Sequence, residues 1–408
     1  MRRLWALLAI ALIPVAHASD EGCRTALLRE ARGIGPIYVR DGVKPDGRYL
    51  LAYYDHANAD PTIVPAPGLS TSPNNQQIRY SRFDDTWVSY VPGRAGMAPV
   101  KASGGFFDPF EPTRPGERPT EIPDGPWKVV AFQNAGSSFS PEAIEPPEAF
   151  GPLCRPGFGF CEVIVYDADR AKTLGLKSRE DVAVLIEVWV HRTRELGSVP
   201  GVEYVAIGEN SGALAAASQP HPHEQVFGYP TVPPRIRAEM AAQEKYSDGQ
   251  SLVELEIEDA RAHGRIVSET DTSVVFVPFA PKNPYEARVA PKRRVARPGD
   301  LSASERLDLA ESVRDLAYRY SRLFPHPSTP HEYVADPYNM GVFQAPPRGE
   351  YPSYHFTVIF EPKLRSVNQD GPVEKRFGTS ESNFGHRIIE GTPEDQAAKL
   401  REAGTRRD

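Results

Sequence analysis

The chain has 408 residues, enough for two or three domains, and its 40% hydrophobic and 25% charged residues are the composition of an ordinary globular protein. Its formal net charge of −7 excludes a nucleic acid as the expected partner, because binding a phosphate backbone requires a basic surface. No apolar run after the N-terminal residues is long enough to span a membrane, so no membrane partner is expected once a leader is removed.

The N-terminus has the pattern of a secretory signal peptide. Two arginines precede an apolar run, and Ala16-His17-Ala18 is a cleavage motif of the A-x-A type. We therefore expect residues 1–18 to be removed and the protein to be periplasmic or secreted, or cytoplasmic if the start is misassigned. Residues 19–77 form an N-terminal extension, in which residues 48–54 follow an Asp-Gly turn and are typical of a strand.

Two of the three cysteines, Cys154 and Cys161, flank a turn-rich loop. In an exported protein they could form a disulfide across that loop. The alternative is two free thiols, one of them buried at the start of a strand. Both alternatives stay open, because a disulfide depends on a distance that sequence spacing does not give.

From residue 78 onward, expected strands and helices follow each other in an order that the second half repeats. Strands are expected at 127–134, 161–166 and 205–208 in the first half, and at 273–279, 338–341 and 354–360 in the second. Helices are expected to begin after Ser178 and Ser302, each a serine three residues before an acidic residue. The order predicts an α+β fold of two tandem units, each a mainly antiparallel sheet with packed helices.

The residues able to carry chemistry concentrate in the stretch Gln219-Pro220-His221-Pro222-His223-Glu224-Gln225. On a strand, His221, His223 and Gln225 share one face, and Glu224 points to the other. A proline before each histidine keeps the backbone extended. A neutral imidazole can attack phosphorus at physiological pH, whereas the competing interpretation is a pair of surface or metal-ligating histidines.

With Glu209-Asn210-x-Gly212 and Ser218 upstream, this stretch resembles the active-site signature of galactose-1-phosphate uridylyltransferases, a branch of the histidine-triad superfamily. The resemblance covers residues 78 to 402 and implies two tandem histidine-triad-like domains, 78–232 and 233–402. It also implies that His223 takes a nucleotidyl group as a phosphoramidate.

The same resemblance implies the residues that bind substrate. Asn210, Ser218 and Gln225 would donate hydrogen bonds to the phosphoryl oxygens. Arg94 matches an arginine that contacts a substrate phosphate, and Asn134 matches an asparagine at the nucleoside-binding edge. The backbone carbonyl near His221 would keep the second nitrogen of His223 protonated. This interpretation requires an imidazole that is not buried and that faces Asn210, Ser218 and Gln225.

The zinc and iron sites of some relatives are expected to be lost, so no cofactor is predicted. The four zinc positions fall at Asp108, Glu111, Arg170 and His221, which is not the cysteine and histidine set that zinc prefers. We expect Arg170 to bridge the two acids as a structural clip; the alternative is three unrelated surface charges. The iron positions fall at Glu239, Phe343, Thr357 and Ile359, which do not form an iron site.

Near the C-terminus, Lys375 and Glu381 resemble the segment that reads the hexose and its phosphate; Lys375 would hold a phosphate and Glu381 a sugar hydroxyl. Neighbouring residues depart from the family, so the sugar is not identified. The resemblance implies a nucleotidylyltransferase that uses a nucleotide sugar, such as UDP-glucose, and a sugar phosphate, and that forms a homodimer. The alternatives are an exported nucleotide-sugar phosphorylase or hydrolase of the same fold, and a catalytically idle nucleotide-sugar-binding protein.

Overall fold

The computed structural model describes residues 25–31, 34–44, 46–56, 74–94, 107, 121–122, 127–246, 249–329 and 332–405. The expected signal peptide, residues 1–18, lies outside these ranges. So do Asp108 and Glu111, and the proposed clip with Arg170 therefore stays a prediction.

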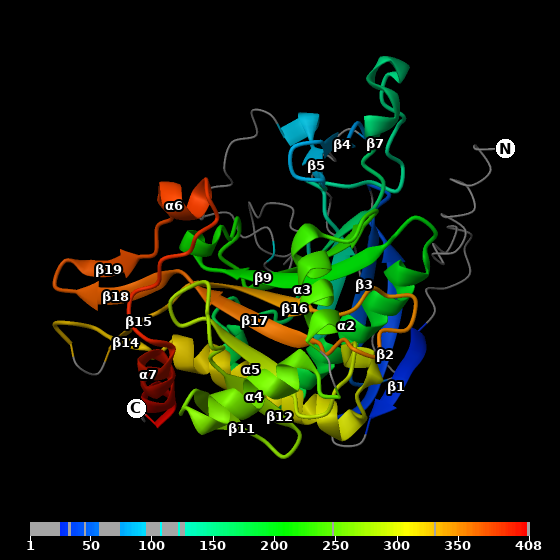
Figure 1. The fold of residues 1–408 in the computed structure, drawn as a ribbon. Coiled ribbons are helices and arrows are strands. Elements are labelled where there is room, and N and C mark those ends of the chain that lie inside the picture. Colours follow the sequence, from blue (N-terminus) through cyan, green and yellow to red (C-terminus); the bar gives the residue numbers. More distant parts are fainter. Residues whose placement is uncertain are drawn as a thin grey trace.

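Twelve strands of the described chain form one sheet, in the order β1-β2-β3-β6-β8-β10-β9-β16-β17-β13-β12-β11, and their pairings are antiparallel (Figure 1). In chain order these strands are β1 (Thr25–Ala31), β2 (Gly35–Val43), β3 (Tyr49–Tyr54), β6 (Val129–Gln133), β8 (Phe160–Val165), β9 (Tyr204–Ser211), β10 (His223–Tyr229), β11 (Ile266–Glu269), β12 (Ser273–Phe276), β13 (Ala287–Pro291), β16 (Tyr338–Phe343) and β17 (Thr357–Pro362). The six strands predicted from residue 78 onward are all present, and they correspond to β6, β8, β9, β12, β16 and β17. The predicted α+β class is therefore confirmed.

The order of the strands is mirrored about the contact between β9 and β16. The strands β10, β8 and β6 follow on one side, and β17, β13 and β12 follow on the other. At this contact Gly208 pairs with Gly341. A Cβ on Gly208 would lie 2.6 Å from the carbonyl oxygen of Met340, so the close approach of the two strands requires a glycine.

Each half supplies one long helix to the same face of the sheet. The helix α2 (Arg179–Ser198) begins after Ser178, whose hydroxyl accepts from the N–H of Asp181 at 3.1 Å. The helix α5 (Ala303–Tyr320) begins after Ser302, which forms a capping box with Glu305. Both helix starts were predicted, because a serine cap with an acidic partner satisfies the first free N–H groups.

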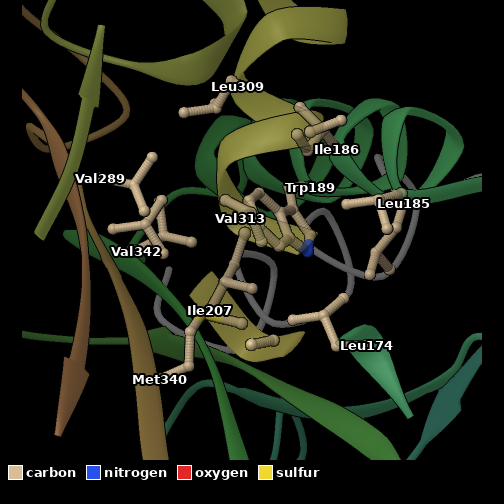
Figure 2. Packing of buried hydrophobic residues seen from close by; sticks show 14 of the residues in the cluster. Leu174, Leu185, Ile186, Trp189, Ile207, Val289, Leu309, Val313, Met340 and Val342 are labelled. Carbon is tan, nitrogen blue, oxygen red and sulfur yellow. The ribbon is translucent and has the colours of Figure 1, made fainter. Parts of the chain in front are cut away.

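The main core lies between these two helices and the sheet. Figure 2 shows Trp189 of α2 between its neighbours on α2, α5 and the central strands. The residues labelled there that belong to this cluster are all buried: Leu174, Leu185, Ile186, Trp189, Ile207, Val289, Leu309, Val313, Met340 and Val342. Complete burial of apolar side chains of this size contributes about 1.5–3 kcal/mol each, so the two helices are held firmly on the sheet.

The N-terminal extension is part of the sheet. The strand predicted at 48–54 is β3, which pairs with β6 along Leu50 to Tyr53. Tyr49 donates to Glu162 at 2.6 Å, and Arg192 of α2 binds the same carboxylate at 2.6 and 2.9 Å. This buried group links the extension to β8 and α2, which flank the strand that carries His223.

Smaller elements surround the sheet. A three-stranded sheet of β5 (Thr86–Tyr90), β4 (Gln77–Ser81) and β7 (Cys154–Pro156) stands apart at the top of Figure 1. The other elements are α3 (Pro234–Lys245), α4 (Leu252–Ala262), α6 (Thr379–Ser382), α7 (Pro393–Thr405) and the strand pairs β14 (Phe324–Pro325) with β15 (Tyr333–Val334) and β18 (Leu364–Asn368) with β19 (Gly371–Glu374). Among the described helices, none has the length and apolar character needed to cross a bilayer.

The structure decides between the two alternatives for the cysteines. Cys154 lies on β7 and Cys161 on β8, and both are buried free thiols. The two strands belong to different sheets, which keeps the sulfurs apart. The free-thiol alternative is confirmed, and the disulfide alternative is wrong.

Candidate active site

His223 is the first residue of β10, at the centre of the large sheet, with β8 on one side and β9 on the other. Its side chain and that of Gln225 lie on the face opposite α2. Glu224 points to the helix side, where it is buried and accepts from Trp189 Nε1–H at 2.6 Å. The alternation predicted from the sequence is therefore observed.

The imidazole of His223 is held in one tautomer. Its Nδ1 lies 2.9 Å from the carbonyl oxygen of His221, so Nδ1 carries the proton and donates it to that oxygen. Burial lowers the pKa of His223 from its usual value, which keeps the ring neutral at physiological pH. No described residue bonds Nε2, whose lone pair is therefore available to a phosphorus atom. The predicted role of the His221 carbonyl is confirmed.

The ring of His223 is only 5% exposed, so the expectation of an open imidazole is wrong. The ring of Phe107 lies edge-on to it with a centroid distance of 4.9 Å, and Phe107 in turn packs on Phe132 at 5.7 Å. Sequence reasoning missed Phe107, because it packs on His223 from a position far away in the sequence. This packing leaves the imidazole little exposed to solvent.

Asn210 lies beside His223. Glu209 pairs with Glu224 across β9 and β10, so the next residue, Asn210, is on the same face as His223. The side-chain Oδ1 of Asn210 accepts from Asn339 of β16 at 2.7 Å, which leaves the Nδ2–H groups of Asn210 to donate to a phosphoryl oxygen. Asn339 also donates to the carbonyl of Ala215 at 2.9 Å, so it fixes both Asn210 and the loop that leads to His223.

Asn339 is a site residue that sequence reasoning did not single out. The sequence did offer one indication of its role. Asn339 lies in the stretch Tyr338-Asn339-Met340-Gly341, which is the second-half counterpart of the stretch around Asn210. Ser218 lies in the loop before His223 and is exposed, and no bond in the described structure joins it to the imidazole. Gln225 is half-buried, two residues beyond His223 on the same face.

Arg94 and Asn134 meet at another place on this face. Asn134 accepts from the N–H of Gly136 at 2.9 Å, and Arg94 donates to the carbonyl of Gly136. The side chain of Asn134 also faces the Sγ of Cys161, which pairs with Phe227 of β10. Phe227 is four residues from His223, so the turn with Arg94 and Asn134 is about 13 Å from His223 along the strand.

The zinc positions do not fit zinc. Of the four, His221 alone is a cysteine or histidine, and its Nε2 donates to the carbonyl of Asp167 at 2.7 Å. Within the described ranges, no group of three or more histidine, cysteine, aspartate or glutamate side chains is arranged to hold a metal ion. The donor set at these positions therefore gives no support for a structural zinc.

At the positions where some relatives bind iron, this chain forms an ion pair instead. Arg288 of β13 donates to both carboxylate oxygens of Glu239, at 3.0 and 3.4 Å, and to the hydroxyl of Thr357 at 3.2 Å. Arg288 also pairs with Ile359 in the strand register. Phe343 lies under the guanidinium of Arg235, 4.6 Å from its ring centroid. A guanidinium thus takes the place of a metal cation next to Glu239, and these residues do not fit iron.

Lys375 and Glu381 contact each other but none of the other site residues described above. The ammonium of Lys375 lies 3.3 Å from Glu381 and donates to the carbonyl of Ile388 at 2.6 Å. Glu381 accepts from the N–H of Gly378 at the start of α6. Their role in binding a sugar phosphate stays a prediction.

Comparison with known proteins places these residues in context. The N-terminal domain family described as "Galactose-1-phosphate uridyl transferase, N-terminal domain" matches residues 131–233, and the corresponding C-terminal domain family matches residues 226–371. Galactose-1-phosphate uridylyltransferase of Thermotoga maritima is 30% identical over 341 residues, covering 80% of this chain and 98% of that protein. The enzyme of Haemophilus influenzae is 28% identical and covers 79% of this chain and 93% of that protein.

Solved structures share the fold. One described as "Structure of uridylyltransferase" superposes with a TM-score of 0.69 at 23% identity and covers 80% of this chain and 98% of that chain. An ADP-glucose phosphorylase from Arabidopsis thaliana with bound ADP-glucose superposes with a TM-score of 0.58 at 20% identity, with 80% and 98% coverage. At these identities the likeness establishes the architecture around His223.

Proposed function

This chain belongs to the galactose-1-phosphate uridylyltransferase family as a nucleotidyltransferase, and we propose that Nε2 of His223 carries the uridylyl group between a nucleotide sugar and a sugar phosphate. The observation that carries the proposal is the fixed tautomer of His223. With Nδ1–H bonded to the His221 carbonyl, the lone pair of Nε2 is the nucleophile.

In the first step, Nε2 attacks the α-phosphorus of a substrate such as UDP-glucose. A nitrogen–phosphorus bond forms, the bond to the bridging oxygen breaks, and glucose 1-phosphate leaves with the electron pair. In the second step, a phosphate oxygen of another hexose 1-phosphate attacks the same phosphorus, and the electron pair returns to Nε2. No general base is required, because the attacking phosphate is already anionic.

The positions of the other residues support placing the α-phosphate of the substrate beside His223 and the nucleoside further along the strand. Asn210 and Gln225 lie beside His223, where donors can stabilise charge on the transferring phosphoryl oxygens. The turn with Arg94 and Asn134 lies about 13 Å further along the strand, and we assign it to the nucleoside end of the substrate. Phe227 and Tyr229, whose rings stack at 5.5 Å on the same face, offer a surface for the base.

A phosphorylase or hydrolase is the second candidate. It is favoured by the contact of Lys375 with Glu381, which occupies the ammonium that would otherwise bind a sugar phosphate. An acceptor as small as phosphate or water would not need a sugar-reading segment. Incubation of purified protein with UDP-glucose and either galactose 1-phosphate or inorganic phosphate separates the two candidates by their products.

The experiment that tests the central proposal is the trapping of a radiolabelled uridylyl adduct from UDP-glucose labelled in the α-phosphate. Wild type should form one adduct per chain at His223, and His223→Asn should form none while retaining the fold. Turnover by His223→Asn at the wild-type rate would overturn covalent transfer. A wild type that binds nucleotide sugars but never forms an adduct would identify an idle binding protein.

We also infer that the chain is a duplicated pair of histidine-triad-like units, which the mirrored strand order about β9 and β16 supports. Export and homodimer formation are further proposals. Cell fractionation with N-terminal sequencing of the mature protein tests the first, and sedimentation equilibrium tests the second.

A further inference from the structure

Directly behind the nucleophile, on the helix side of the sheet, two glutamates face each other across β9 and β10. Glu209 pairs with Glu224 in the strand register, and their side chains are 2% and 0% exposed. Each carboxyl has one hydrogen bond. Tyr166 O–H donates to Oε1 of Glu209 at 3.1 Å, and Trp189 Nε1–H donates to Oε2 of Glu224 at 2.6 Å.

The second oxygen of each carboxyl, Oε2 of Glu209 and Oε1 of Glu224, is buried and has no hydrogen-bond partner in the described structure. The ionisable groups that face the pair are two phenols, Tyr166 of β8 and Tyr338 of β16, and burial raises the pKa of both well above the usual value. The helix α2 contributes the neutral indole of Trp189.

No lysine or arginine of the described chain bonds either carboxyl. The cation next to Tyr166 is Lys177, which lies over the face of its ring at 5.8 Å and is bonded to Asp167. Two carboxylates in an apolar interior with no cation between them cannot both be ionised at moderate cost. The arrangement therefore requires that the pair retain at least one proton.

We propose that Glu209 and Glu224 form a buried acid pair that retains at least one proton and positions the catalytic strand, and that its ionisation places a negative charge behind His223 and slows nucleotidyl transfer. Glu209 directly precedes Asn210, and Glu224 lies between His223 and Gln225. Repulsion between two carboxylates would therefore act on the backbone of the residues that hold the phosphoryl group. The effect on transfer rests on the proposed role of His223 as nucleophile.

The pair loses its proton on the alkaline side of neutrality. Burial raises the pKa of Glu209 to about 8. Burial and the neighbouring Glu209 raise the pKa of Glu224 well above its usual value. At pH 7 the pair is protonated and the strands are held together, whereas above pH 8 a carboxyl O–H gives its proton to the solvent.

The test is the rate of adduct formation from labelled UDP-glucose in a single turnover, measured from pH 6 to 9.5. Wild type should lose about tenfold in rate between pH 7 and 9, as expected for a required acid with a pKa near 8. Glu209→Gln, which keeps an acceptor for Tyr166 and cannot ionise, should keep its rate over this range. Glu203→Gln, an exposed acid just before β9, is the matched control and should follow wild type. An unchanged alkaline loss in Glu209→Gln would overturn the proposal.

An infrared measurement tests the pair without any transfer activity. Wild type at pH 7 should show the carbonyl stretch of a buried protonated carboxylic acid, which disappears above pH 8 and is weakened in Glu224→Gln. Absence of that band at pH 7 would overturn the acid pair. A wild type that shows the band but forms no adduct at any pH would instead contradict the role of His223, so the two failures are distinguishable.

Discussion

Replacing Arg288 by methionine should destabilise the protein through the carboxylate that it leaves behind. The guanidinium binds Glu239 at 3.0 Å, where the gross Coulomb attraction is about 5 kcal/mol at an effective dielectric constant of about 20. Loss of one partner of a fully buried pair costs about 3–5 kcal/mol, because the remaining charge stays desolvated. The two side chains here are 20% and 13% exposed, so water screens part of the remaining charge and we expect a loss of about 2–3 kcal/mol.

The assay is a double-mutant cycle of urea unfolding with Arg288→Met, Glu239→Gln and the double variant. The double variant should be more stable than the sum of the single losses implies, with a coupling of about 1–2 kcal/mol. Arg235→Met is the matched control, since its pair with Glu361 is 42% exposed on the arginine side and should cost less than about 1 kcal/mol.

Additive single losses, or an Arg288→Met variant as stable as Arg235→Met, would refute the argument that a guanidinium replaces a metal cation here. The same argument predicts that iron(II) will not raise the unfolding temperature of wild type, because Glu239 is already paired.

Three further predictions concern Phe107, which packs on His223, the buried His355, and Gly208 at the contact of β9 with β16. Phe107→Ala should raise the rate at which diethylpyrocarbonate modifies His223 severalfold, measured by peptide mass spectrometry; an unchanged rate would show that Phe107 does not limit access. Burial lowers the pKa of His355 to about 4, so between pH 6.5 and 4 the unfolded chain binds more protons than the folded one. The free energy of unfolding should therefore decrease by up to about 3 kcal/mol as the pH is lowered over this range. His355→Gln should flatten that part of the unfolding profile, and an equal slope would contradict the assignment. Gly208→Ala should cost about 2–4 kcal/mol because its methyl group would meet a backbone carbonyl of β16, whereas the strand control Gly42→Ala meets its neighbour at an ordinary 3.7 Å; comparable melting temperatures for the two would refute the steric argument.

The sequence predicted those features that depend on neighbours along the chain. The faces of His223 and Glu224 follow from the two-residue period of a strand, and the tautomer follows from the carbonyl two residues earlier. The helix starts at Ser178 and Ser302 follow from local capping. These predictions needed no knowledge of how the halves pack, and the structure confirms them.

Features that depend on distant segments were not predictable in this way. Phe107 packs on His223 from a position far away in the sequence, so periodicity gave no reason to expect a buried imidazole. The partner of Glu239 is Arg288, and no spacing rule joins residues 49 positions apart. The contacts of Lys375 with Glu381 and with the carbonyl of Ile388 were likewise not predicted, and its role toward a substrate phosphate stays a prediction.

The register of the sheet explains how two similar halves came to have different roles. Gln225 pairs with Gly208, Ile359 pairs with Gly341, and the two glycines pair with each other. Two residues before Gln225 is His223, and two residues before Ile359 is Thr357, so His223 and Thr357 occupy equivalent places. An uncharged hydroxyl at that second place can accept from Arg288 but cannot attack phosphorus at neutral pH. One half therefore keeps a neutral imidazole with a free lone pair, while the other uses the equivalent place to complete a partly buried ion pair, so the proposed transfer uses the half that carries His223.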